Sequence, residues 1–230
     1  MIDGFSQLQI DVPNVDAAVN EYSALLGRTA PDGSQWSLAN IALRLAPTTA
    51  ETAKISRLSL WSKDDTDLPE ETLGLSLAVT SKRDVSSTTS EDIFAVDHLV
   101  LRTTSADDCI ALFGDRLGMR LALDQQVPEW GGRMLFFRCG KLTLEVIQSL
   151  DNPIEQDHFW GITYLCGNLS KTLARLDCEG VMHSGPREGR KPGTRVATVK
   201  SHSLGIPTLL IEPASSESAA KQSRPASSKR

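Results

Sequence analysis

The fold is decided by one stretch of this 230-residue chain, which reads Ala95-Val96-Asp97-His98-Leu99-Val100-Leu101-Arg102. Its aliphatic and β-branched residues predict a strand. A helix is expected to follow, because Ser105 is a good N-cap, apolar residues recur at helical spacing and Gly118 ends the pattern. The next strands are expected over 120–125, 132–138 and 141–148. The predicted order is βαβββ.

The same order recurs on the C-terminal side. A strand is expected over 160–165, and a helix begins after Asn168 and ends at Gly180. Later strands are expected over 194–200 and 207–212. The sequence therefore predicts an α+β protein built from tandem βαβββ modules.

A weaker copy of the unit lies at the N-terminus. It has a strand over 5–12, a helix between Asn14 and Gly27, and strand patterns over 36–45, 55–61 and 73–79. We expect degenerate modules in residues 1–80, a Ser- and Thr-rich linker over 81–93, and two complete modules over 94–214. Residues 215–230 contain no large apolar side chain and are expected to be a disordered tail.

Composition excludes several classes of function. The 24 basic and 29 acidic residues give a net charge of -5 without a basic face, which disfavours nucleic-acid binding. No apolar run approaches the roughly 20 residues of a membrane span, and no signal peptide is recognisable. The four cysteines lie far apart and form no Cys-x-x-Cys pair. We therefore expect a cytoplasmic protein with no nucleic-acid or membrane partner.

The sequence resembles the vicinal oxygen chelate superfamily, which includes glyoxalase I, methylmalonyl-CoA epimerase, extradiol dioxygenases, and fosfomycin and bleomycin resistance proteins. In that superfamily paired modules form curved mixed sheets with helices on the outer face, and the concave face holds a divalent metal. The resemblance is carried by Val96-Asp97-His98-Leu99-Val100-Leu101, residues 111–118, Leu142-Thr143-Leu144-Glu145-Val146, residues 189–196 and Leu210-Ile211-Glu212-Pro213.

The resemblance implies a metal site. His98 matches the first ligand, Glu145 the second and Glu212 the fourth, whereas the third position falls on Gly161, where relatives usually have His. Zn, Ni, Mn and Fe are not distinguished. The alternative is that these residues bind no metal. His98 would then be a hydrogen-bonded strand residue, and Glu145 or Glu212 an exposed strand residue.

The resemblance also implies catalytic and substrate-binding roles. Glu145 or Glu212 would be the proton-transferring base, and the sequence does not choose between them. Trp160 could form a wall of the pocket, or simply pack in the core. Three basic residues of a Gly- and Pro-rich stretch either fold over the pocket to bind an anion or lie in a solvated loop: Arg190, Lys191 and Arg195.

We therefore expect a glyoxalase-like enzyme that performs metal-assisted proton transfer, as an isomerase, epimerase or lyase, on a small oxygenated substrate. The first alternative is a metal-free small-molecule-binding protein of the bleomycin-resistance type. The second is an extradiol-dioxygenase-like oxidoreductase, which Gly161 disfavours because that chemistry uses two His and one Glu. The expected partner is a small molecule, bound by a monomer or a homodimer.

Overall fold

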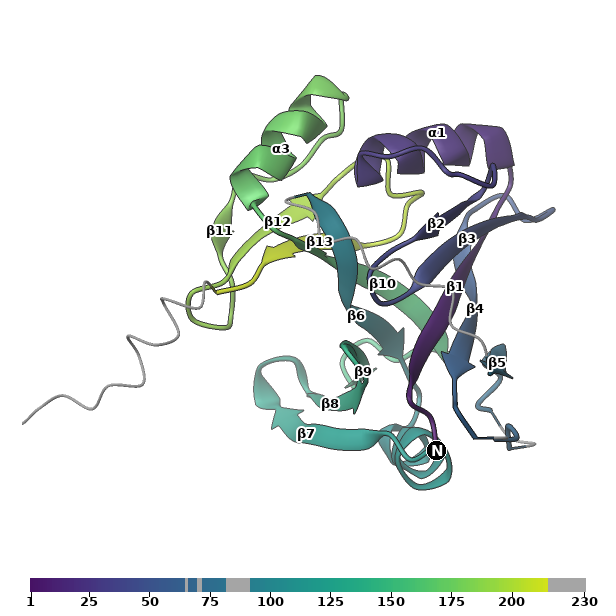
Figure 1. Cartoon of the computed structure of the whole chain (residues 1–230). Coiled ribbons are helices and arrows are strands. Elements are labelled where there is room, and N and C mark those ends of the chain that lie inside the picture. Colours follow the sequence, from purple (N-terminus) through teal and green to yellow (C-terminus); the bar gives the residue numbers. More distant parts are fainter. Residues whose placement is uncertain (65, 70–71, 82–91, 215–230) are drawn as a thin grey trace, which may run out of the picture.

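The computed structural model describes residues 1–64, 66–69, 72–81 and 92–214, which form two mixed sheets with helices (Figure 1). The predicted α+β fold class is confirmed. The larger sheet has the strand order β11-β12-β13-β10-β6-β9-β8-β7. Its strands are β6 (Ile93–Arg102), β7 (Arg120–Val127), β8 (Gly132–Cys139), β9 (Leu142–Ser149), β10 (His158–Cys166), β11 (Arg187–Glu188), β12 (Arg195–Val199) and β13 (Thr208–Glu212).

Two βαβββ units make up this sheet. Their first strands, β6 and β10, pair antiparallel at its centre, and each is flanked by the parallel last strand of its own unit, β9 or β13. Each first strand is followed by helical structure. The helices are α2 (Ala106–Cys109), which continues as the π-helix η1 (Ile110–Arg116), and α3 (Leu169–Cys178); a 3-10 turn, η2 (Pro128–Trp130), precedes β8.

The helices begin where the sequence predicts. The side chains of Ser105 and Asn168 accept hydrogen bonds from the backbone N–H groups of Asp108 and Lys171, which satisfies donors that the first turn leaves unpaired. Gly118 and Gly180 follow the helices with positive φ, a conformation that glycine adopts without strain. The widening of the first helix into η1 was not predicted.

The smaller sheet has the order β2-β3-β1-β4-β5. The strand pairing at its centre is the same as in the larger sheet. β1 and β4 pair antiparallel, and each has a parallel neighbour, β3 or β5. We propose that residues 1–80 are shortened copies of the same unit. The elements are β1 (Gly4–Val12), α1 (Val15–Leu26), β2 (Gln35–Ser37), β3 (Ala42–Pro47), β4 (Lys54–Trp61) and β5 (Leu77–Thr80).

Asn40 joins the two sheets through a hydrogen-bonded contact. It is 4% exposed, donates to the carbonyl of Val96 at 2.6 Å and accepts from the N–H of Val96 at 3.0 Å. The neighbouring Ala39 N–H donates to the carbonyl of Phe94 at 2.8 Å. The loop between β2 and β3 therefore satisfies backbone groups of β6 two residues before His98.

A second contact joins α1 to α3, which lie at the same end of the molecule (Figure 1). The Arg175 guanidinium forms an ion pair with Asp92 and donates to the carbonyls of Ala24 and Leu25 at 2.6 and 2.7 Å. Those carbonyls close α1 and lack helical partners, so a cation there is favourable. A single hydrophobic core runs through both sheets.

Two of the predicted segments fall mainly outside the described residues. Of the linker expected over 81–93, residues 82–91 lie outside them, and Ile93 is already the first residue of β6. The expected tail, 215–230, also lies outside them. In the part of the chain that the structure describes, no helix is long and apolar enough to cross a membrane.

Candidate functional site

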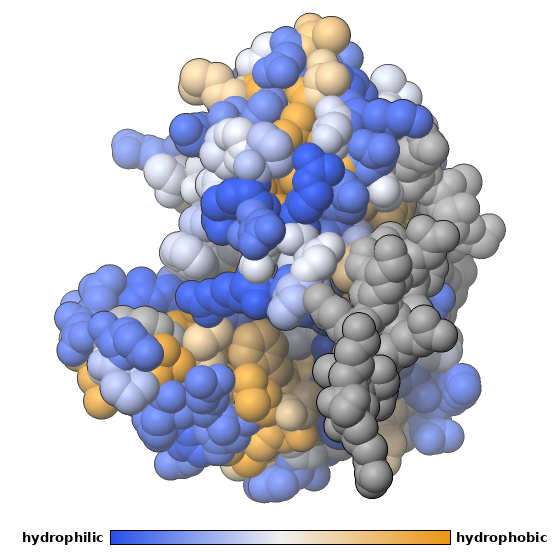
Figure 2. Space-filling model, turned by 90° about the vertical axis from the view of Figure 1, so that its left-hand side faces the viewer, coloured by the Kyte–Doolittle hydropathy of each residue, from blue (hydrophilic) through white to orange (hydrophobic). Residues whose placement is uncertain are grey.

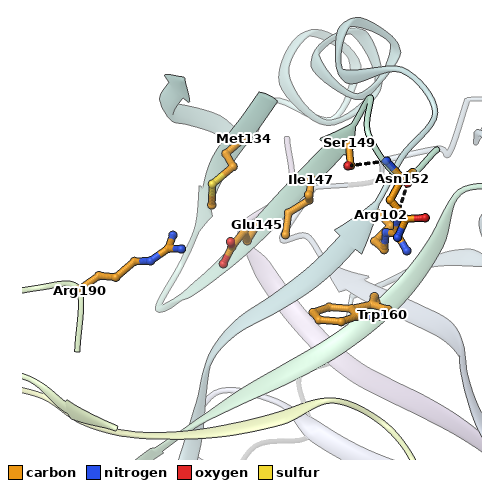
Figure 3. A pocket seen from close by; sticks show the side chains of 8 residues that line it. All are labelled: Arg102, Met134, Glu145, Ile147, Ser149, Asn152, Trp160 and Arg190. Atoms are coloured by element: carbon orange, nitrogen blue, oxygen red, sulfur yellow. Dashed lines mark hydrogen bonds between the residues drawn. The ribbon is translucent and has the colours of Figure 1, made fainter. Parts of the chain in front are cut away.

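The face of the larger sheet opposite its buried aliphatic residues carries a cleft. Alternation along β9 directs Leu144 and Val146 into the core and Glu145 and Ile147 to the other face. Figure 2 shows a hollow between two lobes of the molecule, with apolar residues exposed in its lower wall. A cavity of about 330 Å³ is lined by Arg102, Met134, Glu145, Ile147, Ser149, Asn152, Trp160 and Arg190 (Figure 3).

His98 lies beside Glu145, which lines this cleft. Neighbouring strands β6 and β9 place the His98 Nε2 atom 3.2 Å from the Glu145 Oε2 atom. The same Nε2 lies 2.8 Å from Thr163 Oγ1, and Nδ1 lies 2.9 Å from Asp97 Oδ2. The imidazole ring is therefore held from both nitrogens.

Burial raises the pKa of the Glu145 carboxyl, which is 13% exposed. The electrostatic interactions of Glu145 with His98 and Arg190 act against this shift in pKa, and the interaction with Asp97 adds to it. Figure 3 shows the Arg190 guanidinium directed toward Glu145. A buried carboxylate with a raised pKa is a stronger base than an exposed one, which suits proton transfer near neutral pH.

Glu145→Gln is expected to stabilise the fold at pH 8 by about 0.5–2 kcal/mol. The folded-state pKa of Glu145 lies above its unfolded value, so the folded protein binds this proton more tightly and loses stability as pH rises. The gain should disappear near pH 4, where the carboxyl is largely protonated in both states. Urea unfolding at both pH values measures it, with the exposed Glu51→Gln as control; equal gains at both pH values would contradict the prediction.

Glu212 does not join His98 and Glu145, which corrects the expected ligand set. It lies two residues after the buried Leu210, and alternation along β13 turns it to the helix side of the sheet. Its Oε2 atom accepts a hydrogen bond from the N–H of Leu169 at 2.7 Å, at the start of α3. The carboxylate thus stabilises a helix N-terminus, where negative charge is favoured.

The pairing register shows which residue of the second unit corresponds to Glu145, and it is not Glu212. Glu145 lies opposite Val100, two residues after His98. In the second unit the corresponding residue lies opposite Thr163, two residues after Gly161, and it is Leu209. Leu209 carries no ligand atom, so the resemblance placed the fourth ligand three residues too far along the chain.

Gly161 offers no ligand either, and its surroundings exclude one. A Cβ atom there would lie 2.9 Å from the carbonyl oxygen of Pro207, which accepts a hydrogen bond from the N–H of Ile162 at 2.9 Å. The absence of a side chain therefore permits the close approach of β10 to the turn before β13. A histidine at this position would need the turn to move.

Gly161→Ala is expected to destabilise the protein by about 1–3 kcal/mol, because the added methyl group must displace backbone atoms. Gly185→Ala is the matched control, since nothing lies within 4 Å of a Cβ there and its φ is not positive. Chemical denaturation of both variants measures the difference. Equal free energies of unfolding for the two variants would contradict the prediction, because the turn would then move at no cost in stability.

The expected substrate-binding residues divide into two groups. Arg190 and Trp160 line the cleft. Lys191 and Arg195 do not: Lys191 is exposed, and the Arg195 guanidinium donates to Glu212 at 3.4 Å and to Ser170 Oγ at 3.0 Å. Lys191 and Arg195 thus lie outside the residues that line the cleft, and the anion-binding role expected of them stays a prediction.

Sequence reasoning missed Arg102 and Thr163. Arg102 lines the cleft, and Thr163 contacts the His98 ring. Alternation could have found Arg102, because it lies four residues after His98 on the same strand and therefore on the same face. Thr163 depends on the register between β6 and β10, which the sequence does not contain.

The residues present do not fit the metal site of the superfamily. The His98 and Glu145 atoms are as close as two ligands of one ion, for which bonds of about 2.1 Å give a separation of about 3 Å. Catalytic sites generally have three protein ligands, and two of the four positions are Gly161 and Leu209. Among the described residues, no three His, Cys, Asp or Glu side chains are grouped to hold a metal ion.

Several solved structures resemble the chain. Methylmalonyl-CoA epimerase from Mycobacterium tuberculosis has a TM-score of 0.47 and 18% identity, covering 57% of this chain and 97% of that one. A hypothetical protein from Bacillus halodurans gives 0.44 and 18%, covering 52% and 94%. A Streptomyces coelicolor methylmalonyl-CoA epimerase variant in complex with 2-nitronate-propionyl-CoA gives 0.44 and 16%, covering 54% and 100%.

No curated protein matches this chain. A family model does match, over residues 97–198, and it describes the Glyoxalase/Bleomycin resistance protein/Dioxygenase superfamily. The match begins just before His98 and includes Glu145 and the Arg190 loop. Residues 97–198 are therefore similar to the Glyoxalase/Bleomycin resistance protein/Dioxygenase superfamily.

Proposed function

We propose that the cleft binds a small oxygenated molecule and that Glu145 transfers a proton to and from it, in isomerase, epimerase or lyase chemistry. One observation carries the proposal: a buried carboxylate with a raised pKa lies inside the cleft and within 3.2 Å of an imidazole nitrogen. Perturbed carboxyl groups in clefts are typical of acid–base catalysts.

The contacts of His98 support this role. Asp97 Oδ2 and Thr163 Oγ1 hold the ring from its two nitrogens, at 2.9 and 2.8 Å, and keep Nε2 beside the Glu145 carboxylate. When the C–H bond of the substrate breaks, its electron pair moves onto the adjacent carbonyl and the proton moves to Glu145. Arg190 supplies positive charge near the new oxyanion.

The resemblance implied metal-assisted proton transfer with ligands at four positions. In this chain two of those positions, Gly161 and Leu209, carry no ligand atom. The proposed proton transfer therefore relies on Glu145, His98 and Arg190. It is expected to continue in the presence of EDTA.

Solvent exchange tests the proposal without knowledge of the product. The protein is incubated in D₂O with a panel of small 2-oxo and 3-oxo carboxylic acids, and proton NMR follows loss of the C–H signal beside the carbonyl. Exchange that exceeds the protein-free rate and survives EDTA supports the proposal. Exchange that appears only when a divalent metal is added supports the metal-assisted form instead, and no exchange with any acid contradicts proton transfer.

A metal-free binding protein of the bleomycin-resistance type is the second candidate. It is favoured by Gly161 and Leu209, which leave the cleft without ligands at two positions. Binding without exchange, unchanged by EDTA and by Glu145→Gln, would support this candidate over the enzyme.

A further inference from the structure

The positive and negative charges of the side chains that line the cleft do not cancel. Arg102 and Arg190 are positive, and Glu145 is the one acidic side chain among the eight lining residues. Arg190 is electrostatically coupled to Glu145. Arg102 has no ion-pair partner among the described residues; one of its terminal nitrogens donates to the carbonyl of Asn152 at 2.7 Å.

Arg102 also has two apolar side chains beside it in the cleft, Ile147 and Trp160. In the sheet it pairs with Ile147 of β9 on one side and with His158 of β10 on the other. Ile147 and Trp160 line the same cleft, and Figure 3 shows the Trp160 ring below the Arg102 guanidinium. Apolar walls reduce the solvation of a guanidinium, which strengthens its attraction to an anion.

Trp160 reaches the cleft because of a register shift. Phe159 pairs with Leu101 and Gly161 with Val100, so Trp160 is an additional residue between them. Such bulges change the direction of one side chain and are frequent beside functional sites. The result is a tryptophan that is 43% exposed, although the strand around it is mostly buried.

We propose that Arg102 binds one carboxylate group of the substrate and that Trp160 contacts the apolar body next to it. The substrate class is then a monoanionic carboxylic acid with a flat or apolar group. The net charge of the lining is one positive unit when Glu145 is ionised, which a single carboxylate neutralises. Arginine suits this role because its planar fork can donate two parallel hydrogen bonds to a carboxylate. This inference names a substrate class for the proposed function and rests on the same cleft.

Ligand titration tests the inference with defined probes. Benzoate and phenylacetate are the carboxylates, benzamide is the neutral analogue, and benzylamine is the cation. Isothermal titration should show at least tenfold tighter binding of the carboxylates than of benzamide, with no detectable binding of benzylamine. Equal affinities for benzoate and benzamide, or no carboxylate binding up to the solubility limit, would overturn the inference.

Arg102→Gln should remove the preference for carboxylate over amide, and Trp160→Ala should weaken benzoate and benzamide alike by about tenfold. Arg120→Gln is the matched control, because Arg120 is exposed on the edge strand β7 and lies outside the cleft. If Arg102→Gln keeps the preference, the carboxylate binds elsewhere and the inference is wrong. Circular dichroism of each variant establishes that the fold is intact.

The binding test separates the inference from the proposed function. Glu145→Gln retains Arg102 and Trp160, so it should still prefer benzoate to benzamide even though it lacks the base. A preference without any solvent exchange in the wild type would reject proton transfer and leave the carboxylate site standing. Exchange without the preference would reject the carboxylate site alone.

Discussion

Glu145→Gln lowers the rate of solvent-deuterium exchange into a bound substrate by about 10²–10⁴-fold, the usual contribution of a general base. Glutamine keeps the size and the hydrogen-bonding ability of the side chain but cannot accept the proton. The affinity for the substrate should change little, because the proposed carboxylate contact is to Arg102. Proton NMR at saturating substrate measures the rate.

Two further variants make this prediction sharper. His98→Gln should lower the exchange rate less than Glu145→Gln and should alter its pH dependence, because His98 acts through Glu145. Glu51→Gln, an exposed change outside the cleft, should have no effect. Exchange by Glu145→Gln at the wild-type rate would identify another group as the base and remove the main support for the proposed chemistry.

Asn40→Ala destabilises the protein by about 2–4 kcal/mol, because it leaves the buried N–H and carbonyl of Val96 without partners. For a chain of this size the melting temperature should fall by about 5–15 °C. Differential scanning calorimetry measures the change. Asn20→Ala is the control, since Asn20 is exposed on α1 and alanine favours the helix there.

The Asn40→Ala substitution should also affect the structure of the cleft. Val96 precedes His98 by two residues on β6, so loosening the Asn40 contact should broaden the NMR signals of the His98 ring more than those of His202, which lies in the turn before β13. A fall of less than 1 °C in melting temperature would mean that the two sheets are joined mainly by their shared apolar core.

Local signals allowed most of the fold to be predicted. The helices begin after Asn14, Ser105 and Asn168, because capping depends on a side chain and the backbone two or three residues away. Strands followed from aliphatic and β-branched runs. The π-helical widening at Ile110–Arg116 was not predicted, because helical spacing of apolar residues does not distinguish the two helix types at this length.

The site was only partly predictable, because it depends on register. His98 and Glu145 converge since parallel neighbours β6 and β9 direct them to one face. Glu212 resembled a ligand in its local motif, but its position two residues after Leu210 places it on the helix side. A consistent use of alternation would have rejected Glu212 and selected Arg102. The bulge at Trp160 could not be found this way, because it exists only between paired strands.

The contact between Gly161 and the Pro207 carbonyl has a consequence for evolution and for design. A histidine at position 161 would restore the absent imidazole only if the turn before β13 moved, because that turn lies within 2.9 Å of the place that the Cβ atom requires. With His98 and Glu145 already in place, a ligand at position 161 or at position 209 would each bring the set to three, and both changes would be needed for four. A third ligand at position 161 therefore requires the turn before β13 to move as well. At position 161 the backbone, as well as the missing side chain, therefore opposes the return of a ligand.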